Sequence, residues 1–193
     1  MEKIKKSIKQ FLYSKVCGKE RLRPAQQGLF YEGCNIVATN GGILVILKAE
    51  YEPEYEGKII DRKGAIIEEV YPSYASVVSL MNSVINIYET SQERVGILEK
   101  CLLEIPDELF QITLLEGIND FGEPSPLVVS VELLGQAFKL FSLIGETPKI
   151  YARAEKEQVL TYVPLMLQSE SCTIIITHSE YFAENTYHFD LLW

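Results

Sequence analysis

The sequence predicts an α+β fold in which helices pack on antiparallel sheets, built from βαβββ-type units. Three observations favour this class. The first residues have the apolar spacing of a helix, turns separate several short apolar runs downstream, and residues 127–178 follow the order strand, helix and three strands. With 193 residues, 47% of them hydrophobic, the chain can bury the core of one domain or of two small ones.

The first predicted helix is apolar on one side and basic on the other. The i, i+4, i+7, i+8 spacing gives its inward positions, Ile4, Ile8, Phe11 and Leu12. Lysines occupy the opposite side of the helical wheel, at Lys5, Lys6 and Lys9. Residues 1–23 hold eight basic and two acidic side chains, a local charge of +6 within a chain of net charge -9, which leaves -15 for the rest. This distribution is typical of a protein that presents one face to phosphates, although a solvated lysine-rich turn is the simpler interpretation.

Short strands follow this helix. They are expected at residues 28–31, 35–39 and 43–47, separated by the turns Glu32-Gly33 and Asn40-Gly41-Gly42. Glycine and asparagine supply the positive φ that tight hairpins require. The acidic, proline-containing segment Glu50–Glu56 indicates an exposed turn, and a further hairpin is expected around Lys63-Gly64, between strands at 58–61 and 65–70.

The second half alternates helices and strands. Thr90 and Glu93 form a predicted capping box for a helix that ends before Pro106. A strand is expected at 110–115 and a loop at 117–126. Val128-Val129-Ser130 then leads into a third helix, which ends at the C-terminal cap Gly145. Three more strands are expected near residues 149–154, 159–167 and 172–177.

Three segments carry a family resemblance, in the order Gln27-Gly28-Leu29-Phe30, Ile36–Leu44 and Tyr71–Val78. They resemble the bacterial DNA polymerase III beta subunit, or sliding clamp, superfamily, and the chain resembles a short, divergent member. Such clamps are rings whose helices line a hole around duplex DNA and whose sheets form the outside. The resemblance implies a DNA-clamp-like fold, with a first clamp-like half and its basic helix at 1–79 and a second half or domain with the C-terminal tail at 80–193. Because a bacterial clamp chain has three such domains, a closed ring would need several copies of this one.

The resemblance implies a groove for partner peptides formed by Thr39, Gly41, Leu44, Pro72 and Val77. The glycine turn would let a peptide approach the backbone, and the apolar side chains would form its walls. Hairpin closure and core filling are the simpler roles for the same residues. The sequence departs from the family at positions where aspartate, histidine, arginine and two basic residues are usual: Asn40, Gly42, Ile43, Ala75 and Ser76. The polar rim is therefore missing, and the final wall fits either Val163-Pro164-Leu165 or Ile174-Ile175-Ile176.

The expected function is that of a non-catalytic, sliding-clamp-like accessory protein of DNA replication or repair. By this interpretation it self-associates into a homo-oligomer and faces duplex DNA with a basic helix, and its groove docks DNA polymerase or repair proteins through short peptide motifs. The DNA-binding candidates are Lys3, Lys5, Lys6, Lys9 and Lys15. The alternative is a protein-interaction module that keeps the clamp fold and no longer binds DNA, which the acidic body of the chain favours.

Catalytic chemistry has little support in the sequence, so we expect no enzyme, cofactor or metal. Only His178 and His188 have ordinary pKa values near neutrality, and neither lies in a nucleophile motif. The pair Asp120 and Glu123 has weak glycosidase-like spacing. The four cysteines are widely spread, which argues against a zinc site and favours buried free thiols. No window approaches the roughly 20 apolar residues of a membrane span, so a cytoplasmic location without membrane partners is expected.

The C-terminal segment offers a separate hypothesis. His188-Phe189-Asp190-Leu191-Leu192-Trp193 resembles the short clamp-binding peptides, which combine apolar residues with an acidic one. It would then dock in the groove of its own or a neighbouring copy. A terminal strand with a buried tryptophan is the simpler interpretation.

Overall fold

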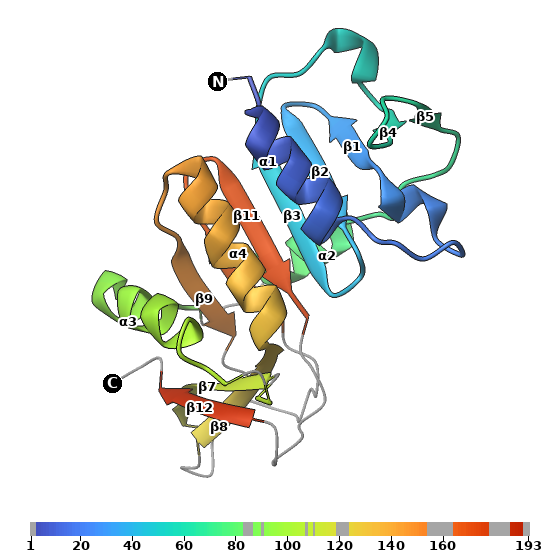
Figure 1. The fold of residues 1–193 in the computed structure, drawn as a ribbon. Coiled ribbons are helices and arrows are strands. Elements are labelled where there is room, and N and C mark those ends of the chain that lie inside the picture. Colours follow the sequence, from blue (N-terminus) through green and yellow to red (C-terminus); the bar gives the residue numbers. More distant parts are fainter. Residues whose placement is uncertain are drawn as a thin grey trace.

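A large antiparallel sheet dominates the computed structural model, which describes residues 3–82, 87–89, 91–106, 108–109, 111–118, 124–153, 164–177 and 186–190. Nine described strands form it, in the order β5 (Ile66–Ile67), β4 (Ile59–Ile60), β1 (Leu29–Glu32), β2 (Asn35–Thr39), β3 (Ile43–Lys48), β11 (Cys172–Ile176), β10 (Leu165–Gln168), β9 (Lys149–Arg153) and β6 (Ile87–Glu89). β3 pairs with β11 from Ile43 opposite Ile176 to Leu47 opposite Cys172. Strands from both ends of the sequence therefore form one continuous sheet (Figure 1).

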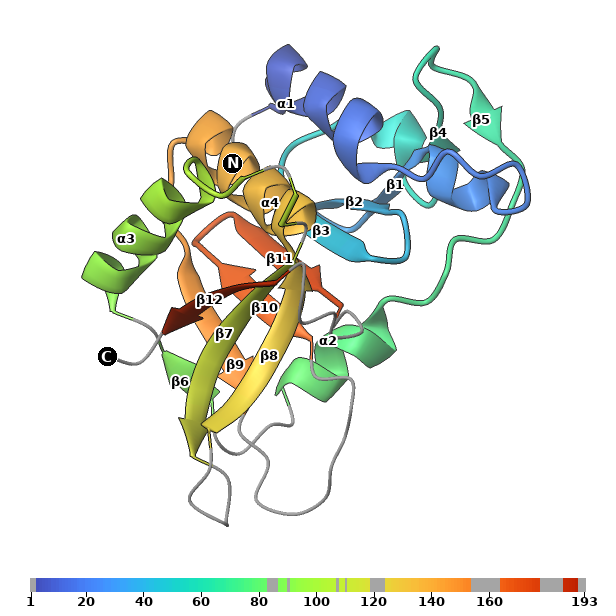
Figure 2. The same cartoon turned by 60° about the horizontal axis from the view of Figure 1, so that its bottom comes forward.

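Helices lie on both faces of this sheet. α1 (Lys6–Phe11) continues as a π-helical turn over Leu12–Val16 and lies beside α4 (Val131–Ile144) on one face. α2 (Ala75–Asn82) lies on the opposite face, and α3 (Gln92–Leu102) contacts α4 and β9 (Figure 2). Two short 3₁₀ turns complete the helical elements, at Pro24–Gln27 and Pro53–Tyr55. Within the described ranges, every helix is too short or too polar to cross a membrane.

The main core lies between the sheet and the layer formed by α1 and α4. The helices contribute large buried side chains such as Leu12, Leu134 and Phe141. Strand side chains alternate between the two faces, so Val45 and Ile174 join this core, whereas their neighbours on β3 and β11 face the other way. That other face carries a second, smaller apolar cluster, which is important for the candidate site.

The predicted β-meander and hairpins are present in the first half. β2 has the predicted bounds, and β1 and β3 differ from theirs by one residue. Gly33, Gly41 and Gly64 have φ values of +61°, +93° and +91°, as the turn assignments require. β4 and β5 are two residues each and are thus shorter than predicted. The first helix buries Ile8 and Leu12 as expected and partly buries Ile4 and Phe11.

The helices of the second half are confirmed. Ser91 caps α3, and its Oγ accepts a hydrogen bond from the Arg94 N–H at 3.3 Å. Thr90, the cap that the sequence predicted, lies outside the described residues. The third predicted helix begins at Val131, directly after β8, and Ser130 caps it, which agrees with the predicted lead-in at Val128-Val129-Ser130. Gly145 ends this helix in the left-handed conformation, with φ +85°, as predicted.

A second sheet contains three described strands in the order β12 (Thr186–Asp190), β7 (Gln111–Ile118) and β8 (Pro124–Ser130). The predicted strand at 110–115 is longer than expected, and part of the predicted loop at 117–126 is strand. β12 pairs with β7 in parallel, from Thr186 opposite Gln111 to Asp190 opposite Leu115. The described part of the C-terminal segment is therefore a strand in a sheet, as the simpler interpretation predicted.

α2 is the helix that the sequence analysis missed. Its valines favour strands when judged by propensity alone, but Val77 and Val78 pack against the second apolar cluster of the large sheet. The division after residue 79 stays a prediction. α2 runs across that point, and the large sheet contains strands from both sides of it.

Candidate functional site

The turn between β2 and β3 is closed by two side chains of the predicted groove segment Ile36–Leu44. The Thr39 hydroxyl donates to the Ile43 carbonyl at 2.7 Å and accepts from the Gly41 N–H at 3.0 Å. Asn40 Oδ1 accepts from the N–H groups of Gly42 and Ile43 at 2.9 and 3.1 Å. Thr39 is 9% exposed, so its hydroxyl serves the turn, whereas the backbone at Gly41 is exposed.

Arg23 is a residue of this region that the sequence analysis did not assign to the groove. A Cβ placed on Gly41 would lie 3.3 Å from Arg23 Nη1, so the guanidinium lies against the glycine turn. Arg23 Nε is 3.7 Å from Glu20 Oε2, which is a loose, exposed contact. The segment that carries Arg23 is anchored to β2 because the Gly18 N–H donates to the Thr39 carbonyl at 3.2 Å.

An apolar cluster lies beside this turn, on the sheet face opposite α1 and α4. Leu44, which pairs with Thr39 in the sheet register, is a buried member, and Val77 from α2 packs against it. The other buried members are Ala25, Val37, Ile59, Tyr71, Met166 and Ile175. Pro72 is exposed and is not part of the cluster. The structure thus brings together Leu44 and Val77, with Thr39 and Gly41 at the adjacent turn. Whether they bind a peptide stays a prediction.

Two tyrosines of the Tyr71–Val78 segment add to this surface. The Tyr71 ring stacks on Phe30 with centroids 4.8 Å apart, and its buried hydroxyl has no hydrogen-bond partner among the described residues. Burial raises the pKa of Tyr71. Tyr74 donates its hydroxyl to Glu32 Oε2 at 2.5 Å, and burial together with this carboxylate raises its pKa to about 12. Both tyrosines are visible in the sequence, but their partners Phe30 and Glu32 lie on β1, about 40 positions earlier in the chain.

The strand wall that the sequence left open stays a prediction. Of its two candidates, Ile175 joins the cluster, whereas Leu165 packs in the core under the helices. Met166, two residues after Pro164, lies directly opposite Ile175 in the β10–β11 pair, and both side chains join the cluster. The position where the family usually has arginine behaves differently. Ile43 is 1% exposed and packs in the core under the helices, so this position adds nothing polar to the groove.

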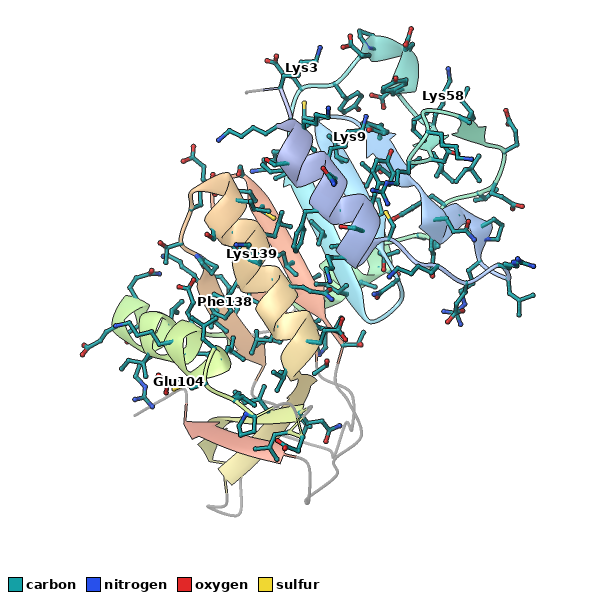
Figure 3. All side chains as sticks on the ribbon, in the orientation of Figure 1. Lys3, Lys9, Lys58, Glu104, Phe138 and Lys139 are labelled. Atoms are coloured by element: carbon teal, nitrogen blue, oxygen red, sulfur yellow. The ribbon has the colours of Figure 1, made fainter. Side chains whose placement is uncertain are left out.

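The basic helix presents most of its predicted DNA-binding lysines to solvent. Lys3, Lys5, Lys6 and Lys15 are exposed, whereas Lys9 is half-buried. On the neighbouring helix, Lys139 is exposed on the side that faces away from the sheet (Figure 3). Lys3 forms an ion pair with Glu52, and Lys9 lies over the rings of two tyrosines. These five residues therefore do not have equal access to a ligand, and their role in DNA binding stays a prediction.

The structure also places several of the side chains considered as metal ligands, catalytic groups or thiols. In these ranges, no group of three or more His, Cys, Asp or Glu residues could hold a metal. His178, Asp120 and Glu123 lie outside the described residues. All four cysteines are free: Cys17 and Cys172 are buried as predicted, but Cys101 is half-buried and Cys34 is exposed.

A shallow pocket of about 420 Å³, lined by residues that carry polar groups, lies where α3, β9 and the β10–β11 turn meet. Its wall includes Glu146, whose carboxylate accepts hydrogen bonds from the Ser171 N–H and hydroxyl at 3.2 and 2.7 Å. Although burial opposes ionisation, these bonds and one from Ser169 lower the pKa of Glu146. This carboxylate therefore fastens a turn.

No family model and no curated protein matches the chain. Solved structures do match it. The beta sliding clamp of C. crescentus has a TM-score of 0.60 over 91% of this chain at 12% identity, and it is matched over 63% of its own length. The DNA polymerase III beta subunit of Pseudomonas aeruginosa has a TM-score of 0.60 over 90% of this chain at 11% identity, and it is matched over 64% of its own length. The Helicobacter pylori beta clamp bound to a DNA ligase peptide has a TM-score of 0.54 over 90% of this chain at 13% identity, and it is matched over 63% of its own length.

These likenesses confirm the predicted fold: the chain has the sliding-clamp fold, with helices packed on a large antiparallel sheet. The sequence identities, 11% to 13%, are low, so these likenesses concern the fold. The chain spans somewhat less than two thirds of the length of the clamps that it matches.

Proposed function

We propose that this protein is a non-catalytic, sliding-clamp-like accessory factor of DNA replication or repair. It self-associates, faces duplex DNA with the basic helix α1 and docks short partner peptides in an apolar groove on the opposite face of the sheet. The observation that carries the proposal is the sliding-clamp fold together with this two-sided arrangement. α1 has exposed lysines on the helical face, and the cluster around Leu44 lies on the other face.

The electrostatic part of the proposal rests on the exposed lysines of the helical layer. Phosphate contacts of this kind do not depend on base sequence, which suits a protein that moves along DNA. The acidic remainder of the chain would repel phosphates elsewhere and so restrict contact to this layer. An accessory role needs no reactive side chain, because shape and charge do the work.

The peptide part rests on the apolar cluster and on the nature of the fold. The Helicobacter pylori clamp binds a DNA ligase peptide, so peptides from polymerases and repair enzymes are the partner class that we propose. The side chains available to such a peptide are the half-buried ones, including Val77, Tyr74 and Phe30. Arg23 supplies a cation beside the Gly41 turn, where an acidic peptide residue would find it.

The DNA proposal is tested by charge reversal at Lys5 and Lys6, which are exposed at the N-terminal end of α1. Binding to a nicked circular duplex is measured at 50 and 200 mM salt, since an open assembly can leave linear DNA by its ends. The wild-type affinity should fall steeply with salt, and Lys5→Glu with Lys6→Glu should weaken binding about tenfold or more.

The matched control reverses Arg62 and Lys63, which are exposed in the turn between β4 and β5. It changes the net charge by the same amount, so it should have a much smaller effect. Equal losses for both double variants, or no binding by the wild type, would contradict the proposal. Peptide binding without duplex binding would favour the protein-interaction module instead.

The groove is tested with a labelled peptide of sequence His188–Trp193, which combines apolar residues with an acidic one. Val77→Ser removes two methyl groups from the cluster and should weaken peptide binding about four- to fifteenfold, since each methyl group that the peptide buries contributes roughly 0.8 kcal/mol. Val70→Ser is the control, because Val70 is 90% exposed and should not matter. An unchanged affinity in Val77→Ser would remove the groove from the proposal.

A further inference from the structure

The acidic segment Glu50–Glu56, called the acidic loop below, lies against the N-terminal end of the basic helix. Lys3 forms an isolated parallel bridge with Glu50, and its Nζ lies 2.5 Å from Glu52 Oε1. In Figure 3, Lys3 lies at the start of α1 on the side of this loop. The most acidic stretch of the chain thus meets its most basic one.

Aromatic side chains extend this contact along the helix. Lys9 Nζ lies 5.7 Å from the ring centroid of Tyr55, which belongs to the acidic loop, and 6.0 Å from that of Tyr31. The Tyr31 ring contacts both loop tyrosines, with centroids 5.0 Å from Tyr51 and 5.3 Å from Tyr55. Tyr31 is 1% exposed, so its ring is held in place by the core, and both loop tyrosines and Lys9 pack against it.

The two ends of the acidic loop are held differently from its middle. Glu56 accepts from the Tyr51 hydroxyl at 2.5 Å and from the Gly33 N–H at 2.9 Å, and the Gly57 N–H donates to the Tyr31 carbonyl at 2.7 Å. Glu52 is about half exposed and contacts Lys3, whose side chain is 71% exposed. The base of the loop is therefore fastened by several hydrogen bonds, whereas its middle is attached to α1 by an exposed ion pair.

We propose that the acidic loop is an electrostatic latch that competes with nucleic-acid phosphates for the N-terminal lysines of α1. The proposal rests on the proposed DNA-binding function and adds its regulation: the protein carries its own competitor. An exposed ion pair is weak, so a phosphate backbone that presents several charges can replace Glu52 on Lys3. Lys9 would follow when Tyr55 moves with the loop, and the fastened base would return the loop once the DNA leaves.

The test compares Glu52→Gln with Glu54→Gln. Both substitutions keep the side-chain shape and remove one negative charge from the same loop. The structure gives Glu52 an ion pair with Lys3, and it records none for Glu54 within the described part of the chain. The affinity for a nicked circular duplex and the salt concentration that elutes each variant from heparin are measured. Glu52→Gln should bind the duplex about three- to fivefold more tightly than Glu54→Gln and should elute from heparin at higher salt.

The outcomes separate the latch from the DNA proposal. If duplex binding occurs and the two variants agree in affinity and in elution, the latch is wrong and the DNA proposal stands. If no variant binds the duplex but Glu52→Gln is retained longer on heparin, the latch is supported and the DNA proposal is wrong. If no variant binds the duplex and heparin elution is the same, both are wrong.

Discussion

At the scale of single residues, the candidate groove residues divide into those that build the turn and those that form a surface. The polar groups of Thr39 and Asn40 form hydrogen bonds within the β2–β3 turn, and Gly41 provides the positive φ that the turn needs. Leu44 and Val77 contribute apolar surface from a strand and from a helix that are far apart in the sequence. The simpler roles of hairpin closure and core filling thus hold for Thr39 and Leu44, and they do not conflict with a groove beside them.

Replacing the buried Thr39 hydroxyl should destabilise the protein. Thr39→Val keeps the shape but leaves the Gly41 N–H and the Ile43 carbonyl without this partner, so we expect a loss of about 1–2 kcal/mol in the free energy of unfolding. Thr39→Ser keeps the hydroxyl and should lose clearly less. Urea denaturation measures both variants. Equal losses would mean that the methyl group, and not the hydrogen bonds, is important.

The four cysteines should react with a thiol reagent in the order of their exposure. Burial raises the pKa of Cys17 to about 12, and burial together with Glu146 raises that of Cys172. At pH 8 both thiols are therefore protonated and covered, whereas Cys34 is exposed. Absorbance with a disulfide reagent at pH 8 should show a fastest phase that Cys34→Ser removes. Persistence of that phase in Cys34→Ser would contradict the assigned burial.

At the scale of elements, strands that alternate around glycine turns were predictable, because turn chemistry and residue period act locally. Cap positions were less predictable. The capping box suggested Thr90, yet the Ser91 hydroxyl accepts the hydrogen bond from the Arg94 N–H. α2 was missed because its two valines suit a strand until the sheet surface on which they pack is known.

The α3 cap gives a direct test of this correction. Ser91→Ala should cost about 1 kcal/mol of unfolding free energy, because the Arg94 N–H loses its side-chain acceptor. Thr90→Ala should change the stability by less than about 0.5 kcal/mol. Thermal or urea denaturation of the two variants distinguishes the assignments, and a larger loss in Thr90→Ala would restore the original prediction.

At the scale of the whole molecule, one sheet joins both ends of the sequence through the β3–β11 pair. Among the described strands, β5 and β6 are the outermost, and Ile66 in β5 is 49% exposed. A sheet edge presents backbone groups that can pair with another chain. We propose that copies of this chain associate through such edges, as the proposed clamp function requires.

Sedimentation velocity over a range of protein concentrations tests this association. The wild type should sediment with a mass above that of one chain, and Ile66→Lys should shift it towards the monomer, because a charge on the edge strand opposes pairing. Leu22→Lys is the control: Leu22 is 94% exposed and lies outside the sheet. A wild type that stays monomeric at all concentrations cannot encircle DNA, and this result would contradict the proposed ring assembly.

The strand and turn pattern of residues 28–67 could be predicted from the sequence, and so could the amphipathic first helix, the Gly145 cap and the likeness to sliding clamps. These features depend on residues a few positions apart, or on short motifs that occur in a fixed order. Three contacts became known from the folded structure: Met166 lies opposite Ile175, Arg23 lies at the Gly41 turn, and the acidic loop pairs with Lys3. Such contacts join residues that are distant in sequence, and no local propensity or periodicity encodes which strands and loops will meet.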